Sequence, residues 1–138
     1  MAKKTTSRQS KSKQRSSIKP TNGKNEIVKV GKHEFTKDKL LEVLKMMLSA
    51  RTVDNKAMNL LRQGKTFFHI AGAGHEAVQL AIGLSLDPKK DWLFPYYRDL
   101  ATVLTAGLTP YEVFLGTFGK ANDPASGGRQ LPVHWGSK

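Results

Sequence analysis

Apolar and polar residues follow a helical period through the middle of the chain. From Leu40 to Leu61, apolar side chains recur every three or four positions, and Asp54 is the one polar member of the series. Thr36 precedes this segment as a helix N-cap, and Gly64 follows it as a stop signal. The pattern predicts a helix over residues 37–63. Its buried face is expected to consist of Leu40, Leu44, Met47, Ala50, Asp54, Ala57 and Leu61.

Short extended segments are predicted on both sides of this helix. Residues 27–35 hold two brief apolar runs around Gly31-Lys32, which favours a hairpin with glycine first in its turn. Residues 92–95 (Trp-Leu-Phe-Pro) are typical of a short buried strand that ends at its proline.

Three more helices are predicted, over residues 75–86, 97–106 and 110–118. The last has the strongest start signal, because Thr109 and Glu112 form a capping box around a proline in the first helical position. The chain after Gly119 is rich in glycine, proline and polar residues, which predicts a loop that carries Arg129, His134 and Trp135.

Residues 1–24 differ from the rest in composition. They carry eight of the 23 Lys and Arg residues, no acidic residue, and only three apolar ones (Met1, Ala2 and Ile18). Such a segment cannot bury a core, so we expect a disordered basic tail before a single domain over residues 25–138.

Two other interpretations of this tail remain. A mitochondrial presequence is also basic, but it needs an amphipathic apolar face, which is missing here. A nucleic-acid-binding arm fits the charge, but no aromatic residues stand among the basic ones to stack on bases. We favour a solvated tail.

Composition excludes several classes of protein. The chain has no cysteine, which excludes disulfide scaffolds, thiolate metal sites and a cysteine nucleophile. No apolar run approaches the roughly 18 residues that span a bilayer, and no apolar stretch follows the basic N-terminus as in a secretory signal. These features predict no membrane segment and a cytoplasmic location, or the mitochondrial matrix in a eukaryote.

The sequence Tyr96-Tyr97-Arg98-Asp99 stands at the predicted start of a helix. Helix N-termini attract phosphate, and an arginine and a tyrosine hydroxyl can add further bonds to it. The alternative is that both tyrosines pack and Arg98 pairs with Asp99 or a neighbour. The spacing leaves both interpretations open.

The chain has four histidines, and no two stand at a metal-binding spacing, which predicts no metal ligands among them. His69, in an apolar loop, is predicted to be a satisfied and partly buried side chain, and His75 to be structural at a helix start. His134, beside Trp135, is the candidate for acid–base chemistry or substrate contact. The pair Gly72 and Gly74 is interpreted as close packing rather than phosphate binding.

Four motifs occur together in order: Gly-Lys-Thr-Phe-Phe (64–68), Ala-Gly-His-Glu-Ala (73–77), Trp-Leu-Phe-Pro-Tyr-Tyr-Arg-Asp (92–99) and Gly-Arg-Gln-Leu-Pro-Val-His (128–134). Over about residues 36–138 the chain resembles the alpha subunit of the thiamin-diphosphate-dependent decarboxylating component of 2-oxoacid dehydrogenase complexes. The last motif is nearer to the branched-chain (2-oxoisovalerate) members than to the pyruvate ones.

The resemblance implies a fold, an activity and a site. The fold would be α/β, and this chain the helix-rich N-terminal part of a thiamin-diphosphate-binding fold that ends in mid-domain. The activity would be oxidative decarboxylation of a 2-oxoacid and transfer of the acyl group to a lipoyl arm. The implied cofactor contacts are Tyr96, Tyr97 and Arg98. The implied substrate contacts are Phe68, Tyr97, Leu131, Pro132, Val133 and His134, with His134 as the catalytic member.

The resemblance also implies partners. These are a beta subunit or fused beta region, a lipoyl acyltransferase core, and an assembly of two alpha and two beta units. The family's Mg²⁺ and diphosphate signature lies beyond Lys138, so we expect Mg²⁺ ligands outside this sequence and no turnover by this chain alone.

Two functions of other classes remain as alternatives. A catalytically inactive interaction module would bind a beta partner without any dependence on the cofactor. A basic nucleic-acid-binding adaptor would show binding that falls steeply with salt and is lost when residues 1–24 are deleted.

Overall fold

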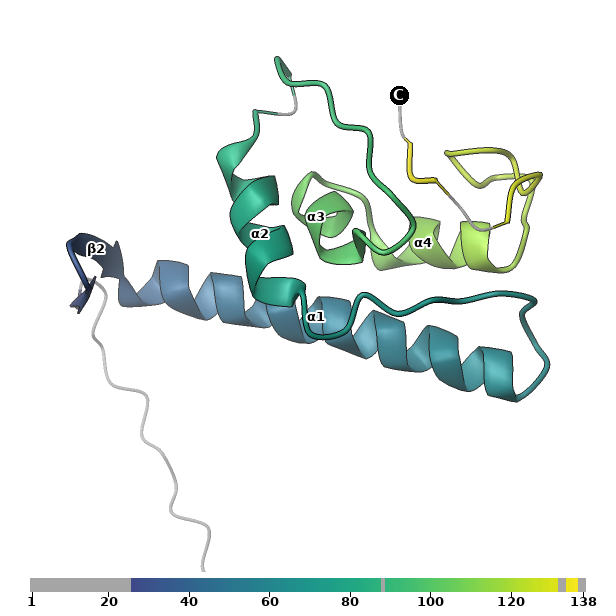
Figure 1. Ribbon diagram of the computed structural model, residues 1–138, viewed down its shortest axis with the longest axis horizontal. Helices are drawn as coiled ribbons and strands as arrows, with labels where there is room; N and C mark the ends of the chain where they lie inside the picture. Colours follow the sequence, from purple (N-terminus) through teal and green to yellow (C-terminus); the bar gives the residue numbers. More distant parts are fainter. Residues whose placement is uncertain (1–25, 88, 132–133, 137–138) are drawn as a thin grey trace, which may run out of the picture.

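The computed structural model describes residues 26–87, 89–131 and 134–136. The predicted tail, Pro132 and Val133 lie outside them. The elements are β1 (Ile27–Val30), β2 (His33–Thr36), α1 (Lys37–Arg62), α2 (Glu76–Ser85), α3 (Leu100–Thr105) and α4 (Pro110–Thr117). In Figure 1, α1 runs along one side of the molecule, and α2, α3 and α4 lie above it. The described part is therefore mostly helical with one small hairpin, and the expected α/β class is met only in part.

The predicted hairpin is present. β1 and β2 pair antiparallel, with Ile27 opposite Thr36 and Val30 opposite His33. Gly31 takes a φ of 59°, which its missing side chain permits at the first turn position. Both strands are largely exposed, so the hairpin contributes little to the core.

The long helix is confirmed, and so are its end signals. The hydroxyl of Thr36 accepts a hydrogen bond from the Lys39 amide at 3.2 Å, and Asp38 lies in the first turn. Gln63 is the C-cap, and Gly64 follows with a φ of 66°.

The predicted buried face of α1 is correct only in its second half. Its buried residues are Ala50, Val53, Asp54, Ala57 and Leu60. Leu44 is 48% exposed and Leu61 is only partly buried. Two adjacent stripes satisfy a period of 3.6 residues, and the packing of the other helices against the middle and C-terminal turns decides between them.

The core consists of two small clusters between α1 and the shorter helices. One contains Val53, Leu100, Val103 and Val113, with Trp135 packed against it. The other contains Ala50, Leu80 and Ala101. Helices α2 and α3 pack closely because Gly83 faces Thr105, and a Cβ at Gly83 would come within 2.7 Å of the Thr105 Cβ.

Two predictions for residues 92–106 are wrong. Residues 92–95 form no strand and are not buried: Trp92 and Phe94 are 88% and 87% exposed and stack on each other. A strand needs a hydrogen-bonding neighbour, and among the described residues only β1 and β2 pair. Helix α3 begins at Leu100 rather than at residue 97, because a turn closed by the Asp99 amide and the Tyr96 carbonyl precedes it.

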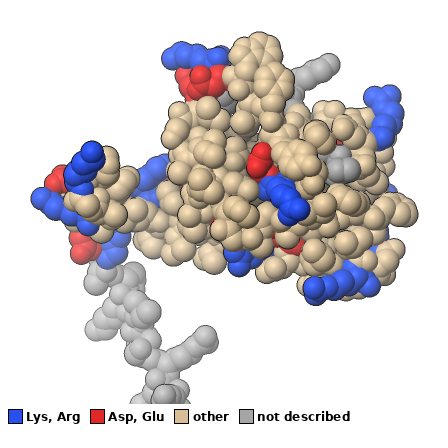
Figure 2. All heavy atoms as spheres, viewed as in Figure 1, with Lys and Arg blue, Asp and Glu red and all other residues tan. Residues whose placement is uncertain are grey.

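The described helices include none with both the length and the apolar character of a membrane span. The face in Figure 2 is mostly uncharged over the helices, and acidic and basic side chains gather at the hairpin end. Several apolar side chains are nevertheless exposed on α1, namely Leu41, Leu44 and Leu48. This surface has no cover among the described residues.

Candidate functional site

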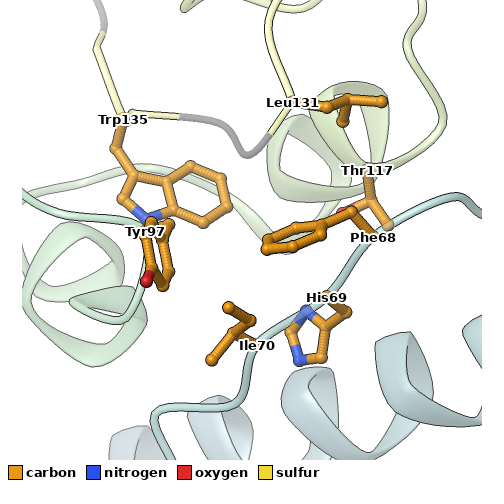
Figure 3. A pocket seen from close by; sticks show the side chains of 7 residues that line it. All are labelled: Phe68, His69, Ile70, Tyr97, Thr117, Leu131 and Trp135. Atoms are coloured by element: carbon orange, nitrogen blue, oxygen red, sulfur yellow. The ribbon is translucent and has the colours of Figure 1, made fainter.

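A small cavity lies where four segments far apart in the sequence meet. It has a volume of about 30 Å³, room for one or two water molecules. Figure 3 shows Phe68 facing Trp135 across it, with His69 and Ile70 below. Its lining residues are Phe68, His69, Ile70, Tyr97, Thr117, Leu131 and Trp135. The cavity is mainly apolar, and His69, Tyr97 and Thr117 bring the polar groups to its wall.

The turn before α3 places two tyrosines and Arg98 together. The rings of Tyr96 and Tyr97 lie 3.8 Å apart between centroids, and the Arg98 guanidinium lies 5.7 Å from the Tyr97 ring centroid. The neighbouring Tyr97 side chain, as a hydrogen-bond partner, and partial desolvation raise the pKa of Tyr96 above its ordinary value. The turn therefore presents a cation and a hydroxyl donor on one surface.

Arg98 does not pair with Asp99, so that part of the packing alternative is wrong, whereas the two tyrosine rings do pack on each other. The Asp99 carboxylate accepts the Tyr96 amide at 2.8 Å, whereas the Arg98 guanidinium donates to the Ala71 carbonyl at 3.2 Å. Arg98 is exposed. Within the described residues that is its one side-chain hydrogen bond, which leaves most of its five donors for a ligand.

His134 and Phe68 both lie against the tyrosine pair. His134 is edge-on to Tyr96 at 5.5 Å and to Tyr97 at 6.3 Å, and Phe68 is edge-on to Tyr97 at 6.2 Å. Leu131 lines the cavity as well. The predicted site residues that the structure describes are thus brought together, although Pro132 and Val133 lie outside the described residues.

Asp54 is the site residue that sequence reasoning missed. Its carboxylate lies 3.0 Å from His69 Nε2, and the side chains are 5% and 15% exposed. His69 is therefore a satisfied and partly buried histidine, as predicted. The signal was available in the sequence, because Asp54 interrupts an otherwise apolar helix face and a buried carboxylate requires a partner.

A second polar pair holds the other end of the same loop. Arg51 on α1 donates to Glu76 at the start of α2, and Glu76 also accepts the Gly74 amide at 3.0 Å. The Arg51 hydrogen bond outweighs burial and lowers the pKa of Glu76. His75 is the N-cap residue of α2, but its side chain makes no capping bond.

The loop after α4 is organised by its own aspartate. The buried Asp123 carboxylate accepts hydrogen bonds from the amides of Ala125, Ser126 and Gly128, and from the Ser126 hydroxyl. Burial alone would raise the pKa of Asp123, but these hydrogen bonds together outweigh it and lower the pKa. The Ser126 hydroxyl in turn accepts hydrogen bonds from the Arg129 and Gln130 amides. These bonds fix the backbone just before Leu131.

Trp135 separates the small cavity from a larger open groove of about 580 Å³. The groove is lined by the segment Asp91–Pro95, by the chain from Ala106 to Leu108, and by Glu112. The indole Nε1 of Trp135 is buried and has no hydrogen-bond partner among the described residues.

Metal ligands were not predicted in this chain. The described residues hold no group of three or more His, Cys, Asp or Glu side chains that could bind a metal ion.

Comparison with known proteins gives one consistent result. The model of the dehydrogenase E1 component family matches residues 44–138. The chain is 41% identical, over 75% of its length, to the 2-oxoisovalerate dehydrogenase subunit alpha of Bacillus subtilis, and covers 32% of that protein.

Two further relatives are more distant. The chain is 34% identical over 80% of its length to the pyruvate dehydrogenase E1 component subunit alpha of Bacillus subtilis, covering 29% of it. It is 32% identical over 75% of its length to the mitochondrial 2-oxoisovalerate dehydrogenase subunit alpha 2 of Arabidopsis thaliana, covering 22% of it. The chain thus spans about a third or less of the curated relatives it matches. No solved structure matches it.

Proposed function

Because this chain belongs to the dehydrogenase E1 component family, we propose that it supplies part of the cofactor and substrate site of a thiamin-diphosphate-dependent 2-oxoacid dehydrogenase. The observation that carries the proposal is the meeting of the Tyr96–Arg98 turn with Phe68 and His134. These residues come from three separate family motifs.

The residues of the turn fit a diphosphate group. Arg98 offers unused guanidinium donors at the surface, and the exposed Tyr96 brings a phenolic hydroxyl beside it. Tyr96, Tyr97 and Arg98 would hold the diphosphate end of the cofactor. When bound, thiamin diphosphate would supply the electron sink that loss of CO₂ requires. The Mg²⁺ that accompanies it in this family finds no ligand group among the described residues.

The substrate contacts are proposed from the family motifs, and the lining of the small cavity supports Phe68 and Leu131 among them. Phe68, Leu131 and Ile70 give this lining an apolar character, which favours contact with an aliphatic side chain, and the cavity would have to widen to admit one. Pro132 and Val133 complete the substrate set by their place in the motif. His134 is the polar member that would hold or transfer a proton beside the substrate, since a histidine can do both near neutral pH.

We propose a branched-chain 2-oxoacid as the substrate. Of the two Bacillus subtilis relatives, the 2-oxoisovalerate one is more similar to the chain than the pyruvate one, and this supports the choice together with the apolar lining. One methylene group changes discrimination only about 10- to 200-fold. The measurement is the ratio of kcat/KM for 2-oxoisovalerate and for pyruvate with the assembled enzyme, and a ratio in favour of pyruvate would contradict the proposal.

Partners are proposed on two grounds. The relatives are named as alpha subunits or E1 components, and α1 exposes Leu41, Leu44 and Leu48 in a row. Exposed apolar rows of this kind are typical of subunit contacts. A beta subunit, in an assembly of two alpha and two beta units, and a lipoyl acyltransferase that receives the acyl group are the partners that we expect.

The cofactor contact is tested by titrating the 138-residue chain with thiamin diphosphate and Mg²⁺ and following the backbone amide NMR signals of residues 96–99. We expect these signals to shift in a saturable way, and Arg98→Ala to weaken the affinity at least tenfold. The control is Arg62→Ala, which changes an exposed arginine at the end of α1. An unchanged spectrum at millimolar cofactor, or equal affinity of the Arg98 variant and the wild type, would refute the contact.

A further inference from the structure

Gln79, on the buried side of α2, joins this helix to the turn before α3 and to α3 itself, 19 and 22 residues further along the chain. Its side chain is buried, with 7% of the residue exposed. The amide Nε2 donates to the Arg98 carbonyl at 2.9 Å, and Oε1 accepts the Ala101 amide at 3.0 Å. Its own backbone carbonyl accepts the Thr102 hydroxyl at 3.1 Å. The Gln79 side chain thus binds Arg98, two residues before α3, and Ala101 in the first turn of α3.

Helix α3 needs this outside partner at its start. Its N-cap residue, Asp99, makes no side-chain bond to the helix, because its carboxylate accepts the Tyr96 amide instead. The first amides of a helix have no acceptor within the helix. Without Gln79 the amide of Ala101, a residue that is 1% exposed, would be buried and unpaired. Gln79 therefore performs the capping function from a neighbouring helix.

The loop before α2 holds Arg98 from the other side. The Ala71 carbonyl accepts the Arg98 guanidinium, and Gly72 lies so close to the Arg98 carbonyl that a Cβ at Gly72 would overlap its oxygen. Gly72 has no positive φ, so contact rather than backbone conformation requires glycine here. The Arg98 backbone is confined between Gly72 and Gln79.

We propose that Gln79 is a positioning residue for the candidate diphosphate contact. Its amide fixes the Arg98 carbonyl and the start of α3 together, and this sets the direction in which Arg98 presents its free donors. The inference rests on the proposed function only for the identity of the ligand. The two hydrogen bonds of Gln79 to Arg98 and Ala101, which we call the clamp, do not depend on that function.

Two substitutions separate the two halves of the clamp. Gln79→Glu keeps an oxygen to accept the Ala101 amide but replaces the donor to the Arg98 carbonyl with a second oxygen. Gln79→Met removes both bonds at similar volume. The control is Gln63→Glu, which makes the same chemical change at an exposed position. Gly72→Ala displaces the Arg98 carbonyl by contact alone and replaces Gln79→Glu if the buried glutamate prevents folding.

The first measurement is backbone amide exchange in the 138-residue chain. In Gln79→Glu we expect exchange of the Asp99 amide, which closes the turn, to rise at least tenfold, with the Ala101 amide within twofold of wild type. Gln79→Met should raise both, and Gly72→Ala should raise Asp99 exchange. A purely structural role would raise both amides in Gln79→Glu. That result, or unchanged Asp99 exchange, would overturn the proposal.

The second measurement is the affinity for thiamin diphosphate. We expect a loss of at least fivefold for Gln79→Glu and for Gly72→Ala, and none for the Gln63 control. Wild-type affinity in a variant whose Asp99 exchange has risen would overturn the positioning role. If the wild-type chain binds no thiamin diphosphate, the proposed function fails, and the exchange measurements still decide whether Gln79 forms the clamp.

Discussion

Two of the loops that contribute to the candidate site are held in different ways. Residues 66–75 are fixed by pairs to other elements, His69 with Asp54 on α1 and Gly74 with Glu76, which pairs with Arg51. Residues 119–131 are fixed from within, because the Asp123 carboxylate accepts hydrogen bonds from three amides and a hydroxyl of the same loop. Substitutions that disrupt the first loop should therefore destabilise the helices as well, whereas substitutions that disrupt the second should affect only that loop.

The largest loss of stability is expected for Asp54→Ala. This change leaves His69 buried without its partner, and it should lower the free energy of unfolding by about 3 kcal/mol. Urea unfolding of the full chain measures this. Asp38→Ala is the control, because an exposed aspartate in the first turn of the same helix contributes only about 0.5 kcal/mol. A loss for Asp54→Ala no greater than that of the control would show that the pair does not hold the loop.

Asp123→Ala should have a smaller global effect and a large local one. We expect a loss of about 2 kcal/mol, because several hydrogen bonds to one carboxylate disappear together. Amide exchange at Ala125, Ser126 and Gly128 should rise strongly while exchange in α1 stays unchanged. Asp91→Ala removes a single exposed hydrogen bond to the Asp87 amide and serves as the control. Faster exchange across α1 would contradict the local character of this loop.

Glu76→Gln should cost about 1 kcal/mol. The substitution keeps an acceptor for the Gly74 amide but removes the charge that pairs with Arg51. Glu42→Gln, in an exposed pair with Lys39, is matched in chemistry and should change stability by less than 0.5 kcal/mol, on the order seen for such pairs. Equal effects of the two substitutions in urea unfolding would mean that the Arg51 pair adds nothing.

The smallest effect is the dependence of stability on pH. The pKa values of Glu76 and Asp123 lie below their ordinary values of 4.5 and 3.8. Both groups therefore stabilise the fold fully above those ordinary values, and this stabilisation is lost as pH falls through the lowered pKa values. Unfolding measured between pH 7 and pH 3 should show this loss. It should be weaker in a chain with both Glu76→Gln and Asp123→Asn, and an identical pH profile would contradict it.

Much of the helical structure could be predicted because its signals are local. The Thr36 cap, the Thr109–Glu112 capping box and Gly64 each act within one turn of the chain, and the structure shows all three. The region before α3 could not be predicted in this way. The apolar run at residues 92–95 is equally consistent with a buried strand or an exposed segment, and only the absence of a pairing neighbour among the described elements decided it.

By itself the sequence determined the hairpin, the helices apart from the start of α3, and the family, and it proposed the candidate site residues other than Asp54, because caps, periodicity and motifs depend on neighbours along the chain. The tertiary structure decided which face of α1 is buried, that Asp54 pairs with His69, and that Gln79 rather than Asp99 caps α3. Each of these joins residues 15 or more positions apart. Such contacts depend on how the helices pack, and no local pattern of residues specifies that packing.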